Sequence, residues 1–137
     1  MRIYHHIDEF KNALADWKRY RSISEDLFVS DRDTRNMVMH AMMISIQSSI
    51  DIAADIIADG KLEKPGSYRE AFEILGKHSI ISERSVQDLS DLAGFRNILV
   101  HRYGDLDIGQ VYAILQQDYC VLDTYLGAIQ RYLQKMA

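Results

Sequence analysis

Three side chains whose types could take part in chemistry lie close together in the second half of the chain: Arg96, His101 and Tyr103. An arginine guanidinium stays charged and presents a planar fork that matches phosphate oxygens. A histidine exchanges protons near neutral pH and can act as a general acid or base. Residue types of this kind are suited to holding an anion such as phosphate and to exchanging a proton.

Arg96 also has a purely structural interpretation. On a helical wheel it lies beside an apolar stripe, and an unpaired charge buried in such a place costs several kcal/mol. An ion pair with Asp51 or Asp55 would satisfy the guanidinium without any role in chemistry. The wheel alone favours this ion pair, because ion pairs in helical bundles are more common than active sites.

Helices are predicted to position these residues. The chain has a single proline, Pro65, and no stretch alternates between apolar and polar residues as a strand would. Apolar residues instead recur at steps of three and four, the spacing of one helix face. This spacing predicts a first helix through Ile3 and Trp17, a polar connection over 22–30 and a long helix over about 31–59.

Three further helices are predicted in the second half of the chain. Ser67 caps a short helix, and a longer one runs from near Ser82 to Gly104, with the phosphate-binding candidates in its last turns. A final helix begins after Asp107 and continues unbroken almost to the C-terminus. The final helix would then be the longest in the chain, and the helix over 31–59 the second longest.

The predicted fold class is all-α, an up-down helical bundle of four long helices plus one short helix. A chain of 137 residues, 47% of them apolar, supplies one core of ordinary size, so a single domain over 1–137 is expected. The formal charge is −4 and the pI is near 5.7. This balance excludes a broad basic surface that coats nucleic acid, so any such contact must be local.

Sequence composition also bears on the cellular location of the protein and on whether it binds a metal. No window approaches the run of about 18 to 20 apolar residues that a membrane span requires, and the N-terminus lacks an apolar signal core, so a cytoplasmic protein is expected. The lone Cys120 is predicted to be a small core residue. The pairs His5–His6 and Asp51–Asp55 lack a third ligand at a recognised spacing, so we assign no metal and no cofactor.

The spacing of Arg96, His101 and Tyr103 resembles the R-x4-H-x-Y signature of the HEPN superfamily, and specifically of its HepT-like toxin branch. The run GFRNILVH over 94–101, the long second helix and the closing amphipathic helix are similar to that branch across most of the chain. R-x4-H alone arises by chance in many helices. Asn97, Tyr103 and the position near a helix end make this match specific.

The resemblance implies a metal-independent endoribonuclease, in which a ribose 2′-hydroxyl attacks the adjacent phosphate and leaves a cyclic phosphate. Arg96 would then bind the scissile phosphate, and His101 would transfer protons. Asn97 would orient the imidazole or bind substrate, and Arg102 would add a phosphate contact. For Asn97 a plain intrahelical contact, and for Arg102 a solvated charge, remain alternatives.

The resemblance also gives Tyr103 a role. In HepT-like systems the tyrosine of this motif is adenylylated by a minimal nucleotidyltransferase antitoxin, and the attached AMP would bring phosphate charge and bulk beside Arg96. Packing as an aromatic at the edge of the core is the alternative for Tyr103. For the whole chain, the alternative is a non-catalytic helical module that presents Tyr103 and a nucleotide-sized cleft to such a partner.

A homodimer is expected from the same segment. His101 follows Arg96 by five residues, roughly 140° around an ideal helix, so the two side chains do not share a face. The stretch around Ile98 and Val100 is apolar nearly all round, which is more than one core requires. A two-fold axis would bring two copies of Arg96 and His101 into one cleft.

Overall fold

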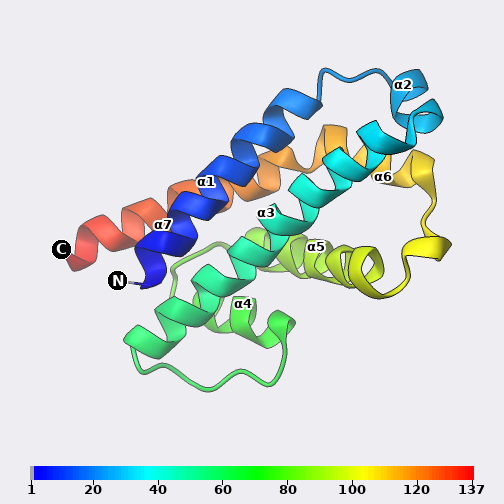
Figure 1. Cartoon of the computed structure of the whole chain (residues 1–137). Coiled ribbons are helices and arrows are strands. Elements are labelled where there is room, and N and C mark those ends of the chain that lie inside the picture. Colours follow the sequence, from blue (N-terminus) through cyan, green and yellow to red (C-terminus); the bar gives the residue numbers. More distant parts are fainter. Residues whose placement is uncertain (1) are drawn as a thin grey trace.

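The computed structural model describes residues 2–137, and within them the chain folds into helices with no strand (Figure 1). The predicted all-α class is confirmed. The elements are α1 (Arg2–Tyr20), α2 (Glu25–Ser30), α3 (Arg32–Asp59), α4 (Tyr68–Lys77), α5 (Glu83–His101), the 3₁₀ turn η1 (Tyr103–Asp105), α6 (Ile108–Gln117) and α7 (Tyr119–Met136).

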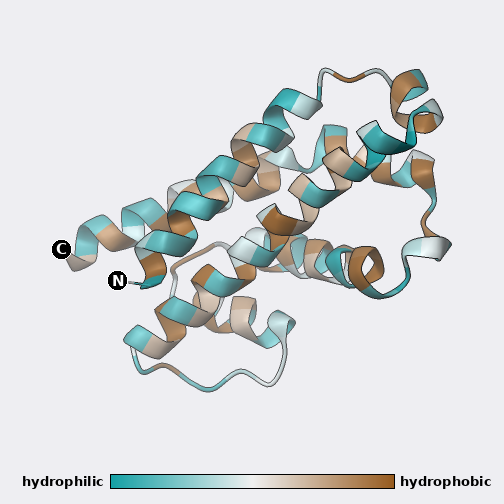
Figure 2. Cartoon of the chain, viewed as in Figure 1, coloured by the Kyte–Doolittle hydropathy of each residue, from teal (hydrophilic) through white to brown (hydrophobic). Residues whose placement is uncertain are grey.

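The bundle is built around α3, which contacts α1, α2, α4, α5 and α7. Figure 1 shows α3 crossing the molecule, with α1 beside it and α4 and α5 packed against it. Its fully buried apolar residues include Val38, Met42, Ile52 and Ala53. Burial on several sides explains why its hydrophobic residues are not confined to one stripe, whereas apolar and polar residues alternate along α1 (Figure 2).

By length and apolar composition, α3 is the one helix in residues 2–137 that could cross a membrane. We expected no such segment from the sequence. Within the bundle, 67% of its most apolar window is buried. The core helix of a soluble protein has this composition too, because its apolar residues are covered by neighbouring helices instead of lipid.

Local capping signals locate three helix starts correctly. In each, a side-chain oxygen accepts a hydrogen bond from a backbone N–H three residues later, which satisfies a donor that the helix leaves unpaired. The pairs are Ser67 with Glu70 at 3.1 Å, Ser82 with Ser85 at 3.1 Å and Asp107 with Gln110 at 3.2 Å.

The single final helix predicted from the sequence is wrong, because it is broken at Asp118 into α6 and α7. A continuous helix would offer the Leu115 carbonyl to the N–H of Tyr119. In the structure, that carbonyl accepts a hydrogen bond of 2.8 Å from Trp17 Nε1 on α1. Because of this break, α3 is the longest helix in residues 2–137. Cys120, near the start of α7, is exposed, not in the core as predicted.

The predicted polar connection over 22–30 also needs correction, because its second half forms α2. The Ser24 hydroxyl accepts a hydrogen bond from the Leu27 N–H, and Phe28 is fully buried against Tyr112 of α6 at 5.5 Å between ring centroids. A helix of six residues contains too few turns for a periodic pattern to reveal it.

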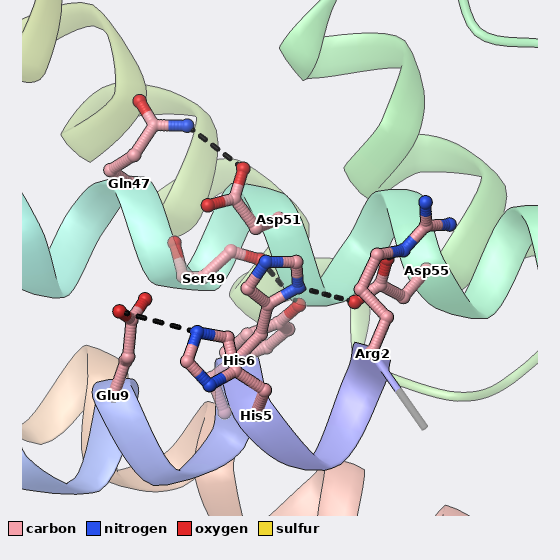
Figure 3. Close-up of polar contacts among 9 residues, drawn as sticks. Arg2, His5, His6, Glu9, Gln47, Ser49, Asp51 and Asp55 are labelled. Atoms are coloured by element: carbon pink, nitrogen blue, oxygen red, sulfur yellow. Dashed lines mark hydrogen bonds and ion pairs between the residues drawn. The ribbon is translucent and has the colours of Figure 1, made fainter.

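A buried carboxylate joins α1 to α3 (Figure 3). Asp55 of α3 accepts a hydrogen bond of 2.8 Å from Arg2 Nε and lies 2.5 Å from His6 Nδ1. The Asp55 side chain is only 4% exposed, so these two partners replace the water it has lost. Asp51, one turn earlier, accepts a hydrogen bond from Gln47 at 3.0 Å.

We predict that Asp55→Ala lowers the free energy of unfolding by about 1 to 3 kcal/mol, because two hydrogen-bonded partners lose their acceptor and a cavity forms. Urea denaturation measures this loss. Asp16→Ala is the control, since it removes an exposed pair with Arg19 and should cost less than about 1 kcal/mol. Equal losses in the two variants would contradict a structural role for Asp55.

Candidate active site

The candidate site occupies the free end of α5. Leu89, Leu92 and Leu99 are buried and anchor the helix against the bundle, and α5 contacts α3, α4 and α7. The helix ends at His101, where the Arg102 N–H bonds to the Ile98 carbonyl at 2.9 Å. The helix was predicted to run to Gly104, but after His101 the chain instead enters η1, and the φ of Gly104 is not positive.

Arg96 is half-buried and has no carboxylate partner among residues 2–137. Its Nη1 donates to Asn97 Oδ1 at 3.0 Å, its Nε is buried without a hydrogen-bond partner, and its Cζ lies 5.8 Å from the ring centroid of Tyr68. The predicted ion pair with Asp51 or Asp55 is wrong, because those carboxylates are engaged by other side chains. The guanidinium is therefore available to an anion.

His101 is the last residue of α5 and is exposed. No hydrogen bond or ion pair joins its ring to another side chain of residues 2–137, Arg96 included. The two residues do not form a preassembled pair, as their different directions on the helical wheel predicted. An exposed imidazole at a helix end is free to contact a substrate or a second protomer.

The two candidate substrate-binding residues have different partners. Asn97 is exposed and bonds Arg96, not His101, so its position supports the guanidinium. Arg102 Nε lies 3.3 Å from Asp105 Oδ2, and the side chains are 68% and 66% exposed. A surface pair of this kind is weak, so a phosphate can displace Asp105 at little cost.

Tyr103 lies on η1, not on the helix, and is 48% exposed. Its hydroxyl donates to Asn36 Oδ1 of α3. The ring also lines a cavity of about 390 Å³ together with residues of α3, and Leu99 of α5 forms another wall. Asn36 was not identified as a site residue from the sequence. The available signal was its spacing of four residues from His40, which places both polar side chains on one face of the helix.

Negative charge collects on a different side of α5. A cavity of about 710 Å³ there is lined by Asp91, Asp105, Asp107 and Asp118 among other residues. Burial raises the pKa of Asp118, and the charges of Asp88 and Asp91 raise it further. Four aspartates against one arginine, Arg69, make this side net acidic, which disfavours a polyanion there. No group of three or more potential metal ligands occurs in residues 2–137.

Fold and motif together define an all-helical HEPN-type protein with R-x4-H-x-Y at a helix end. A family model described as "Ribonuclease HepT-like" matches residues 10–129. The chain belongs to this family, which makes it a ribonuclease by class and confirms the resemblance seen in the motif.

Two curated relatives span most of the chain. The tRNA nuclease HepT of Aphanizomenon flos-aquae is 29% identical over 85% of this chain and 79% of its own length. The mRNA nuclease HepT of Shewanella oneidensis is 26% identical over 75% of this chain and 77% of its own length.

Two solved structures share the fold. The tri-AMPylated HEPN toxin of Shewanella oneidensis, in complex with its MNT antitoxin, superposes with a TM-score of 0.86 at 23% identity, covering 94% of this chain and 96% of that one. The cytosolic protein YutE of Bacillus subtilis gives a TM-score of 0.86 at 21% identity, covering 98% and 90%. At these identities the likeness establishes the helical architecture.

We predict that Arg96→Ala changes the free energy of unfolding by less than about 1 kcal/mol, because the guanidinium has no carboxylate partner and its Nε is unsatisfied. Urea denaturation provides the measurement. Leu99→Ala is the comparison: its side chain is 7% exposed and should cost about 2 to 5 kcal/mol. A loss of about 3 kcal/mol or more in Arg96→Ala would restore the structural interpretation.

Proposed function

We propose that this chain, as a single domain over 1–137, is the endoribonuclease toxin of a toxin–antitoxin pair and acts on RNA in the cytoplasm. The observation that carries the proposal is the half-buried Arg96 with no carboxylate partner, held by Asn97 one turn before an exposed His101. Retaining such a charge without a partner is costly unless a ligand uses it. Membership of the HepT-like ribonucleases supplies the ligand class, a phosphodiester.

In the proposed reaction, the ribose 2′-oxygen attacks the adjacent phosphorus and forms the O2′–P bond, while the P–O5′ bond breaks. His101 accepts the proton of the 2′-hydroxyl or donates one to the leaving 5′-oxygen. Arg96 binds the scissile phosphate and stabilises the charge that gathers on its oxygens. The products are a 2′,3′-cyclic phosphate and a 5′-hydroxyl, and no step calls for a metal.

Asn97 and Arg102 have supporting roles in this proposal. Asn97 holds the Arg96 guanidinium through Oδ1 and so limits its rotamers. Arg102 exchanges Asp105 for a neighbouring phosphate of the RNA. Both residues are exposed, which allows them to reach substrate without rearrangement of the core.

We predict that Arg96→Ala and His101→Ala each reduce RNA cleavage by about 10² to 10⁴-fold in the presence of excess chelator, since each removes one element of transition-state stabilisation or proton transfer. Gel analysis of a defined RNA, with mass spectrometry of the ends, gives the rate and the cyclic phosphate. Arg84→Ala is the control, because its side chain is 91% exposed near the other end of α5. Unchanged cleavage in both site variants would refute the assignment and favour a non-catalytic interaction module.

A homodimer completes the proposed site. Ile98 and Val100 are 38% and 41% exposed on the motif helix, and two copies of His101 would provide both an acid and a base. Leu99, between them in the sequence, is buried within the protomer, so Ile98 and Val100 are the residues that we propose for the contact.

We predict that Ile98→Glu makes the protein monomeric, as measured by light scattering after size exclusion, and reduces cleavage by at least about 10²-fold because the composite site is lost. Val29→Glu places the same charge on another exposed apolar position, 51% exposed on α2, and should leave both properties unchanged. A monomeric Ile98→Glu protein with full activity would show that one protomer suffices.

Neutralisation is proposed to act on Tyr103. A minimal nucleotidyltransferase antitoxin would transfer AMP from ATP to the Tyr103 oxygen, with pyrophosphate as the leaving group. The half-exposed ring makes the hydroxyl accessible once its bond to Asn36 opens. The Shewanella oneidensis relative, an AMPylated toxin solved with its MNT antitoxin, supports this partner for the present chain.

A further inference from the structure

The cavity beside Tyr103 has two kinds of wall. Polar side chains of α3 line one part of it at successive turns: Arg32, Asn36 and His40. Apolar side chains line the other part: Met39 and Met43 of α3 with Leu99 of α5. Residues four apart on a helix lie above one another, so each set forms a continuous strip.

This combination of walls suits a nucleotide. A guanidinium binds phosphate oxygens, amide and imidazole groups bond to the edges of a base or to ribose, and methionine provides an adaptable apolar surface for a planar ring. The volume of about 390 Å³ falls within the range of about 300 to 1,000 Å³ typical of small-ligand pockets.

Charge distinguishes this cavity from its neighbours. Its lining contains one cation and no carboxylate. The cavity on the other side of α5 is lined by four aspartates and one arginine, Arg69. The groove between α1 and α3 contains Glu9 and Asp16, and it shares Asn36 and His40 with the cavity beside Tyr103. No ion pair or side-chain hydrogen bond within residues 2–137 engages Arg32. Although the chain has a net charge of −4, the lining of this cavity does not repel a phosphate group.

We propose that this cavity binds one nucleoside monophosphate unit, with Arg32 on the phosphate and with Asn36 and His40 on the base or sugar. The inference rests on the proposed function and adds a second part to the site. Leu99, which lines the cavity, lies three residues after Arg96 on α5, so the cavity and the proposed phosphate ligand are placed by neighbouring positions of one helix.

Two sources can supply the nucleotide. One is the RNA residue adjacent to the scissile phosphate. The other is AMP attached to Tyr103, whose hydroxyl already points to Asn36 at the cavity wall. Once the Oη–P bond has formed, Tyr103 has no proton to donate to Asn36, which frees the amide to bond the attached nucleotide. Occupation of one cavity by either source would make adenylylation and RNA binding mutually exclusive.

The test measures binding of a fluorescein-labelled 2′-O-methyl RNA pentamer, which cannot be cleaved, to the full chain at several salt concentrations. Arg32→Ala should weaken binding about tenfold, as loss of a charge-assisted phosphate contact does. It should also reduce the slope of log affinity against log salt by about 0.7, the value for one phosphate of a single strand. His40→Ala should weaken binding with no change in slope, and Arg84→Ala should match wild type.

A second arm identifies the source. Wild type and Arg32→Ala are incubated with the nucleotidyltransferase and ATP, Tyr103 is analysed by mass spectrometry, and the thermal midpoint is compared before and after modification. A rise in midpoint in wild type that is absent in Arg32→Ala assigns the cavity to the attached AMP. If Arg32→Ala weakens pentamer binding but does not change the midpoint shift on modification, the cavity binds a nucleotide of the RNA substrate.

RNA binding by Arg32→Ala and His40→Ala equal to that of Arg84→Ala, with no Arg32-dependent midpoint shift, would overturn this inference. The cleavage assay on Arg96→Ala and His101→Ala remains independent of this result. Loss of cleavage in those variants with unaltered pentamer binding by Arg32→Ala leaves the proposed function standing without the second site. Arg32-dependent binding in a protein that does not cleave RNA leaves the nucleotide site without the nuclease.

Discussion

Burial of α3 along most of its length is the constraint on which the other helices depend. A helix covered on several sides must satisfy its polar groups internally, and α3 does so by turning serine hydroxyls back onto its own carbonyls: Ser45 bonds to Ala41 at 2.8 Å and Ser49 to Ile46 at 2.6 Å. Asp55 is satisfied by α1 instead. These bonds allow α1, α4, α5 and α7 to pack closely around one axis.

The position of α5 on this core explains how the site can retain an unpaired charge. Leu92 and Leu99 anchor the helix on either side of Arg96, so its guanidinium is held at the edge of the packing and not within it. The carboxylate that was a candidate partner for Arg96, Asp55 of α3, is instead paired with Arg2 and His6. The buried carboxylate stabilises the bundle, while Arg96, the proposed phosphate ligand, has no carboxylate partner in residues 2–137. This agrees with the general observation that functional sites carry unsatisfied groups.

The same arrangement accounts for an acidic protein that acts on a polyanion. Negative charge is concentrated around Asp91, Asp107 and Asp118. The cavity beside Arg32 has no carboxylate in its lining, and Arg96 has no carboxylate partner among residues 2–137. The proposed attraction for phosphate would therefore be local and oriented. Such a distribution favours one geometry of approach over general adhesion to RNA.

Local sequence determined much of this protein. Periodicity predicted an all-helical fold, the side chains of Ser67, Ser82 and Asp107 marked helix starts, and the motif in α5 indicated the family. These features depend on residues within a few turns of one another, where spacing alone is informative.

Only the tertiary structure decided the rest, because each remaining feature depends on residues far apart in the chain. The break at Asp118 accompanies a bond from Trp17 to Leu115, and α2 is held by the burial of Phe28. Asp55 is paired with α1, which leaves Arg96 without the expected carboxylate, and Tyr103 bonds Asn36 across 67 positions. Sequence predicted the candidate residues of the site, and packing around α3 decided which of them have a partner within the described chain.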